Sequence, residues 1–103
     1  MGADYRRVMR NGKRLRTALM VVVYTPVEEP WSRAGIAVSR KVGNAVVRNR
    51  VKRWMREACR HHLDELRVPQ DVVLVAHPAC ANAGYDQVAA TLQKSIQRIN
   101  QRS

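Results

Sequence analysis

The first third of the chain changes from a helical pattern of apolar residues to extended, β-prone segments. Asp4–Arg10 predicts a short helix with one apolar face, formed by Tyr5, Val8 and Met9. Gly12 follows, and a glycine at this point predicts a left-handed residue that ends the helix. The chain is then extended and becomes strongly β-prone at Leu19–Tyr24, while Lys13–Thr17 either belongs to that strand or forms one of its own.

A loop of proline and glutamate separates this strand from a second one at Ala34–Ser39. Because the two strands are consecutive in the chain, we expect them to pair as an antiparallel hairpin with a long connection. The main helix begins at Asn44 or Ala45 and runs to about Leu66, since Pro69 stands where a helix stop is expected.

Two further elements complete the pattern. Asp71–Ala76 is nearly continuous in apolar residues, which predicts a strand covered on both faces. Tyr85–Gln101 predicts a last helix, with apolar residues at helical spacing at Tyr85, Val88, Leu92, Ile96 and Ile99. The order is α-β-β-α-β-α, with an additional early strand left open, and 103 residues predict a single domain, 1–103.

The main helix divides into an apolar arc and a basic arc when its residues are spaced about 100° apart. The apolar arc consists of Val47, Val51, Trp54, Met55, Ala58, Cys59, His62 and Leu66. The opposite arc consists of Asn49, Arg53, Arg56 and Arg60, flanked by Arg48, Arg50 and Lys52. One side of this helix is therefore expected to cover a sheet, and the other to face a different partner.

The charge of this segment favours a polyanion over water as that partner. Glu57 is the one acidic residue among eight basic ones from Arg40 to Arg60, whereas a solvated helix usually mixes the two signs. The whole chain has a formal net charge of +11, and arginine binds phosphate through two parallel hydrogen bonds. Basic helices also lie on membranes or bind calmodulin, but Trp54 and Met55 are needed here to cover the strands.

Other chemistry in the sequence is sparse. Cys59 and Cys80 form neither a disulfide framework nor a metal knuckle, which predicts reduced thiols in a cytoplasmic protein. His61, His62 and Asp64 are the one group that suggests a metal site, and a cluster at the helix end explains them as well. No apolar run approaches the roughly 18–20 residues of a membrane-spanning helix.

A longer motif resembles a known family. The run SRKVGNAVVRNRVKR at residues 39–53, followed by Arg56-Glu57, resembles the signature of the bacterial ribonuclease P protein subunit, whose RNR element corresponds to Arg48-Asn49-Arg50. Weaker similarities extend over nearly the whole chain, at Asp4-Tyr5, Val8, Gly12-Lys13-Arg14, Asp71–Pro78 and Tyr85. The patterns of helix-turn-helix, RRM and KH domains are absent.

This resemblance implies an α+β fold, a two-layer α/β sandwich around a four-stranded sheet with the order αβββαβα. It also implies that the strand–helix–strand unit from Ala34 to Ala76 has an unusual left-handed crossover. Parallel strands are connected with the right hand in about 98% of cases, so pattern reasoning alone predicts the opposite hand.

The resemblance further implies the protein subunit of a ribonucleoprotein that removes the 5′ leader from precursor tRNA. In that family the RNA subunit performs a metal-assisted hydrolysis, Mg²⁺ is held mainly by RNA, and no protein side chain is a catalytic group or metal ligand. The partners expected are the catalytic ribonuclease P RNA and the leader, with no membrane and no obligate protein partner. The alternative is a non-enzymatic RNA-binding protein of similar fold, such as a ribosomal protein or an RNA chaperone.

Site residues follow from the matched positions. Contacts with the RNA subunit are implied for Arg40, Lys41, Asn44, Arg48, Asn49, Arg50, Lys52, Arg53 and Arg56. Arg60 follows by helical phase, and we call these residues together the basic stripe. Arg48 and Lys52 border the apolar arc, so local anchoring of either side chain stays open.

The family's leader-binding cleft lies between the sheet and the first helix, and its candidates here are Tyr5, Met9 and Tyr24. Tyr5 stands at the family's phenylalanine, where either stacking on a base or packing of the short helix explains it. Met9 stands where the family often has a second aromatic residue, and His77 stands where the family commonly has an arginine. The few residues before Asp4 fit either a short natural form or a trimmed chain.

Overall fold

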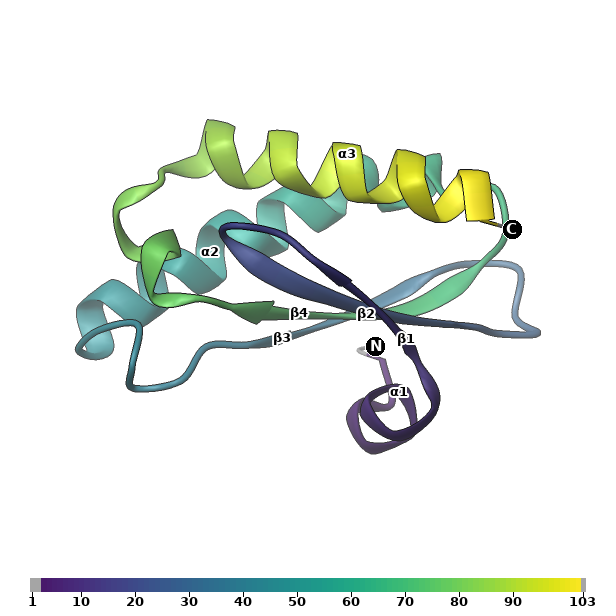
Figure 1. Cartoon of the computed structure of the whole chain (residues 1–103), viewed down its shortest axis with the longest axis horizontal. Coiled ribbons are helices and arrows are strands. Elements are labelled where there is room, and N and C mark those ends of the chain that lie inside the picture. The colour runs from purple at the N-terminus through teal and green to yellow at the C-terminus, as the bar shows by residue number, and fades with distance from the viewer. Residues whose placement is uncertain (1–2, 103) are drawn as a thin grey trace.

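The computed structural model describes residues 3–102, in which a four-stranded sheet separates two unequal helical layers (Figure 1). The elements are α1 (Tyr5–Asn11), β1 (Lys13–Arg16), β2 (Met20–Pro26), β3 (Arg33–Ala37), α2 (Ala45–His62), β4 (Gln70–Ala76) and α3 (Tyr85–Arg102), with short 3₁₀ turns η1 (Leu63–Glu65) and η2 (Pro78–Asn82). The α+β class and the order αβββαβα are confirmed, and the segment after α1 does form a strand of its own.

The strand order in the sheet is β1-β2-β4-β3, which makes the predicted β2–β3 hairpin wrong. β2 pairs antiparallel with β1 and β4, and β3 pairs parallel with β4. The apolar β4 takes the sheet centre, where both of its faces are covered, and the half-buried β3 stays at the edge. Parallel neighbours need a long crossover connection, which α2 supplies. Its left hand stays a prediction of the resemblance.

The two faces of the sheet carry cores of different size. α2 and α3 cover one face, where the large buried side chains include Met20, Val22, Met55, Leu74, Leu92, Ile96 and Ile99. α1 alone covers part of the other face (Figure 1), with Val8 against Val21, Val23 and Val73. Because side chains alternate along a strand, consecutive residues of β2 belong to different cores.

The end of α1 differs from the sequence prediction. Asp4 caps the start of the helix by accepting a hydrogen bond from Arg7 N at 3.3 Å. Gly12 has an extended backbone with φ −75°, so the predicted left-handed residue is wrong. A glycine is needed there for space, since a Cβ would lie 2.5 Å from the Val8 carbonyl oxygen and 2.8 Å from Val23 Cγ1.

The main helix begins as predicted and ends earlier. Asn44 is its N-cap and accepts a hydrogen bond from Val47 N at 3.0 Å. α2 ends at His62, and the chain tightens into η1 before Leu66, which is still buried in the core. The predicted apolar arc is therefore continued by a 3₁₀ turn and not by further helix.

Candidate nucleic-acid interface

The outer face of α2 presents cationic side chains that have no protein partner. Arg53 and Arg56 are exposed, and Arg48 and Lys52 are half-buried. None of these four side chains makes a hydrogen bond or ion pair with any described residue. Like charges at this spacing repel one another, so an anion bound along the helix would be stabilised by all of them.

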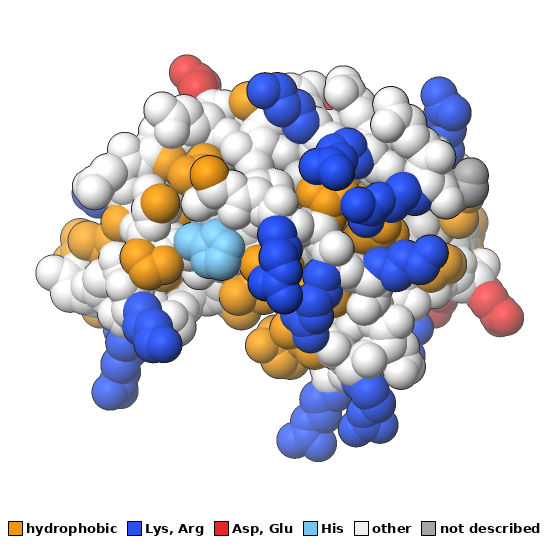
Figure 2. Space-filling view, viewed as in Figure 1, with side chains coloured by type: hydrophobic (Ala, Val, Ile, Leu, Met, Phe, Trp, Pro, Cys, Tyr) orange, Lys and Arg blue, Asp and Glu red, His pale blue; other side chains and the backbone are white. Residues whose placement is uncertain are grey.

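The basic surface continues beyond this helix. Arg40 and Lys41 are exposed in the segment that leads into α2, and Asn49 is exposed on the helix. Asn44 is exposed too, but its side-chain oxygen is occupied by the helix cap. Figure 2 shows that Lys and Arg side chains also far outnumber Asp and Glu on the face of the molecule seen in Figure 1.

Arg50 differs from its neighbours because it anchors α2 to the turn after β4. Its Nη2 donates to the Ala81 carbonyl oxygen at 3.3 Å, and its guanidinium carbon lies 5.5 Å from the centroid of the Trp54 ring. Its Nε is buried and makes no hydrogen bond with any residue from 3 to 102. The local anchoring left open for Arg48 or Lys52 is thus made by Arg50.

Arg60, at the last turn of the stripe, is partly neutralised. Its Nη2 lies 2.9 Å from Glu57 Oε2 in an exposed pair. This hydrogen bond lowers the pKa of Glu57 and raises that of Arg60. An exposed pair of this kind contributes little to stability, so a phosphate can replace the carboxylate.

The leader-cleft candidates do not share one face of the sheet. Tyr5 is 49% exposed on α1, and Met9 is half-buried at the edge of the small core. Tyr24 belongs to the large core on the α2–α3 side, is only 5% exposed, and its hydroxyl accepts a hydrogen bond from Arg102 Nη1 at 3.1 Å. Its side chain therefore packs on the sheet face opposite to Val8, because β2 turns alternate residues to opposite faces, but Tyr24 also lines a hollow of about 240 Å³ with Asn11 at the end of α1.

Sequence reasoning missed a buried ionic cluster that holds α1 on the sheet. Asp71 at the start of β4 has a fully buried side chain. It accepts hydrogen bonds from Arg7 Nη2 at 2.6 Å and from Arg33 Nε and Nη2 at 2.8 Å each. A signal was present, since a carboxylate inside an apolar strand needs cationic partners when it is buried.

The two arginines also decide the charge of Asp71. Burial alone would raise the pKa of this carboxyl, but the hydrogen bonds from Arg33 and Arg7 outweigh it and hold the pKa below its usual value. The hydrogen bond to Asp71 raises the pKa of Arg33 in turn. The cluster therefore stays ionised at neutral pH and joins α1 to β3 and β4.

The histidines and cysteines lie outside the Asp71 cluster. His62 Nδ1 lies 2.8 Å from Glu65 Oε2, and His61 Nε2 lies 3.6 Å from Glu57 Oε2. Within residues 3–102, no three His, Cys, Asp or Glu side chains are grouped so as to hold a metal ion. Cys59 and Cys80 are free and buried, and burial raises the pKa of Cys59 to about 12. No helix in the described part of the chain is suited to crossing a membrane.

Comparisons with known proteins show which family this sequence resembles. The family model for ribonuclease P matches residues 2–100. The ribonuclease P protein component of Desulfatibacillum aliphaticivorans is 37% identical over 92 residues, which cover 89% of this chain and 78% of the relative. That of a Nocardioides species is 39% identical over 101 residues, covering 95% and 86%.

Solved structures agree as well. The RNase P protein of Thermotoga maritima has a TM-score of 0.82 at 28% identity, with 92% of this chain and 90% of that chain covered. The Staphylococcus aureus RNase P protein has a TM-score of 0.79 at 29% identity, with coverage of 93% and 87%.

Proposed function

The chain belongs to the family of ribonuclease P protein components, the protein part of an endoribonuclease that processes tRNA, and from this premise we propose that α2 binds the catalytic ribonuclease P RNA while the α1 side binds the 5′ leader of precursor tRNA. In this proposal the RNA subunit performs the hydrolysis, and the chain acts by binding and positioning. The whole chain works as one RNA-binding domain in the cytoplasm.

The observation that supports the RNA-subunit contact most strongly is the unpaired state of the cations on α2. Arg53 and Arg56 project from the helix with no carboxylate partner in the described chain, although Asp and Glu are available elsewhere. Guanidinium groups bind phosphate through two hydrogen bonds, and each neutralised phosphate releases counterions. The remaining proposed contacts are made by Arg40, Lys41, Asn44, Arg48, Asn49 and Lys52, with smaller contributions from Arg50 and Arg60.

The leader is proposed to lie beside α1, where Tyr5 exposes about half of its side chain next to the partly covered sheet. Stacking on an aromatic ring tolerates any base, and alanine substitution typically costs about 1–3 kcal/mol per base. Met9 borders the same region. The ionic cluster at Asp71 fixes α1 on the sheet, so the position of Tyr5 depends on Arg7.

Magnesium is assigned to the RNA in this proposal. The carboxylates and histidines of residues 3–102 do not converge on a common point, and the buried Asp71 is already bound by two arginines. The chain would favour Mg²⁺ binding only indirectly, by holding the RNA phosphates in place.

The decisive experiment is a reconstitution with a bacterial ribonuclease P RNA at low Mg²⁺, in which the release of a precursor-tRNA leader is followed. We expect the chain to stimulate cleavage. RNA binding without stimulation would overturn the proposal and indicate an RNA chaperone or ribosomal protein, an alternative that the comparisons do not favour.

A second arm tests the leader contact. Tyr5→Ala should weaken binding of the leader-bearing substrate by about 1–3 kcal/mol. Binding of mature tRNA should stay unaffected, because mature tRNA has no leader base to stack on Tyr5. An equal loss for both RNAs would mean that Tyr5 only packs α1.

A further inference from the structure

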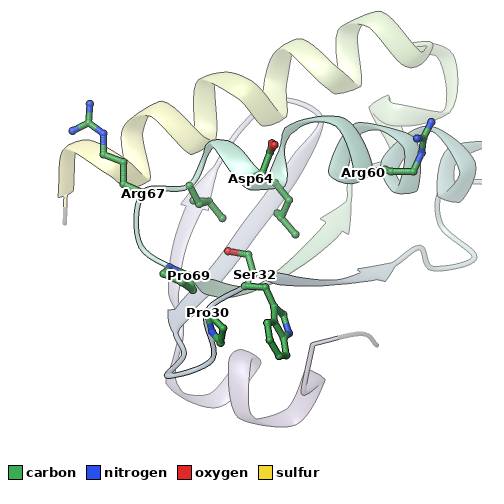
Figure 3. Close-up of a pocket in the computed structure, with 9 residues that line it drawn as sticks. Pro30, Ser32, Arg60, Asp64, Arg67 and Pro69 are labelled. Atoms are coloured by element: carbon green, nitrogen blue, oxygen red, sulfur yellow. The ribbon is translucent and has the colours of Figure 1, made fainter.

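A cavity at the C-terminal end of α2 has features that the proposed function does not use. Its volume is about 430 Å³, and it lies between the β2–β3 loop, the last turn of α2 and the segment that leads into β4. Pro30, Leu63, Leu66 and Pro69 give it apolar walls. Figure 3 shows these segments around the cavity, with Pro30 and Pro69 close together on one side.

Trp31 is exposed beside this cavity. Its side chain is 59% exposed, and it is not part of either hydrophobic core. Tryptophan is rarely left this open without a partner, because its large ring is stabilised by burial. A flat exposed ring next to apolar walls offers a stacking surface for another planar group.

Two arginines flank the cavity and add charge to this surface. In Figure 3, Arg60 and Arg67 lie at its two ends, with Asp64 between them. The Arg67 guanidinium makes no hydrogen bond or ion pair within residues 3–102. Arg60 is held by exposed contacts alone, with Glu57 and with His61 Nε2 at 3.3 Å. Both are therefore available to phosphate.

The cavity is continuous with the outer face of α2. A second hollow, of about 480 Å³, shares Ser32, Arg60 and Leu63 with it and adds Arg56 from the stripe. An RNA strand bound at Arg56 can therefore continue past Arg60 to Trp31.

We propose that the cavity beside Trp31 receives one unpaired nucleotide of the RNA partner. The base stacks on Trp31, and phosphates of the same strand contact Arg60 and Arg67. This inference rests on the proposed function and extends the RNA contact beyond α2 and α1.

Three substitutions of Trp31 test the stacking by equilibrium binding of the chain to ribonuclease P RNA at fixed salt. Trp31→Ala and Trp31→Leu should each raise Kd by about fivefold to a hundredfold, while Trp31→Tyr should stay near wild type because it still stacks. An unchanged Kd for Trp31→Ala overturns the inference. Full binding by Trp31→Leu overturns it as well, because an apolar occupant such as a peptide side chain would explain that result.

The arginine contact has a matched control in the same chain. Arg67→Ala should reduce the slope of log K against log salt by about 0.7–0.9, whereas Arg98→Ala, at an exposed position of α3, should leave it unchanged. Equal slopes for the two variants overturn the role of Arg67.

A fluorescence measurement observes Trp31 directly. In a Trp54→Phe background Trp31 is the only tryptophan, and RNA binding should quench its emission. Suppose that Arg53→Ala combined with Arg56→Ala weakens binding, but RNA does not quench Trp31 emission and Trp31→Ala does not change Kd. This inference then fails and the proposed function stands. If Trp31 is quenched but the chain does not stimulate leader release, the proposed function fails and the nucleotide site stands.

Discussion

Arginines play opposite parts in two regions of this molecule. Around Asp71, Arg7 and Arg33 are bound by a buried carboxylate and hold α1 to the sheet. On the outer face of α2, Arg53 and Arg56 have no acidic partner within the described chain. The comparison shows that the pairing of a side chain within the protein, and not its residue type, separates cations that stabilise the fold from cations available to RNA.

The largest effect is expected on the free energy of unfolding, when the buried carboxylate of Asp71 is replaced. Asp71→Asn removes the charge that Arg7 and Arg33 share and should lower the free energy of unfolding by about 3 kcal/mol, the lower end for a broken buried pair. The lower end applies because both arginines keep some contact with water. Urea unfolding measures the change, and Asp64→Asn, at an exposed position of η1, is the charge-matched control. A loss equal to that of the control would contradict the structural role of the cluster.

The same cluster predicts a pH dependence. Because the pKa of Asp71 is lowered in the folded state, the unfolded chain binds this proton more tightly. The stabilisation is complete above the unfolded pKa of about 4 and is lost as the pH falls through the folded pKa. The difference in unfolding free energy between wild type and Asp71→Asn should therefore shrink below about pH 4. A difference that stays constant to pH 3 would show that the fold does not lower the pKa of Asp71.

The next largest effect is expected on RNA binding, when the unpaired arginines on the outer face of α2 are removed. Arg53→Ala combined with Arg56→Ala removes two proposed phosphate contacts, which should reduce the slope of log K against log salt by about 1.4–1.8 for ribonuclease P RNA. Stability should change by less than about 0.5 kcal/mol per substitution, since neither side chain has a partner among the described residues. An unchanged slope would mean that these arginines only solvate the helix.

Arg50 sharpens the comparison because it lies on α2 and yet contacts the protein. Arg50→Ala loses the hydrogen bond to Ala81 and the contact with Trp54, which should cost about 1–2 kcal/mol of unfolding free energy. Arg53→Ala is the matched control on the same helix and should cost almost nothing. Equal stability of the two variants would assign Arg50 to RNA contact alone.

The elements of the fold were predictable where the signal is local. The apolar spacing of α2 and α3 and the continuous apolar run of β4 place these elements to within a few residues. The pairing of β3 was not predictable, because both a β2–β3 hairpin and a β3–α2–β4 unit satisfy the same local pattern. Gly12 was misassigned for a related reason: its constraint is the approach of Val23, eleven residues further along the chain.

The same division applies to the site. Helical phase predicted the exposure of Arg53 and Arg56, since it depends only on neighbours within the helix. The roles of Arg50 and Asp71 depend on partners 31 and 64 residues away in sequence, which no local pattern specifies. Tyr24 shows the limit for strands, because alternation defines two faces but not which of them α1 covers.

The smallest effect concerns Glu57, the one carboxylate within the basic stripe. Glu57→Gln removes the partner of Arg60 and a negative charge close to the proposed RNA path, so affinity for ribonuclease P RNA should rise slightly. The gain should be largest at low salt, where exposed charges are least screened. The charge-matched control is Asp86→Asn at the start of α3, which should leave affinity unchanged. Because the same charge is removed in both variants, equal gains would show that the RNA responds only to net charge, and a gain confined to Glu57→Gln would show that the RNA lies close to Glu57 and Arg60.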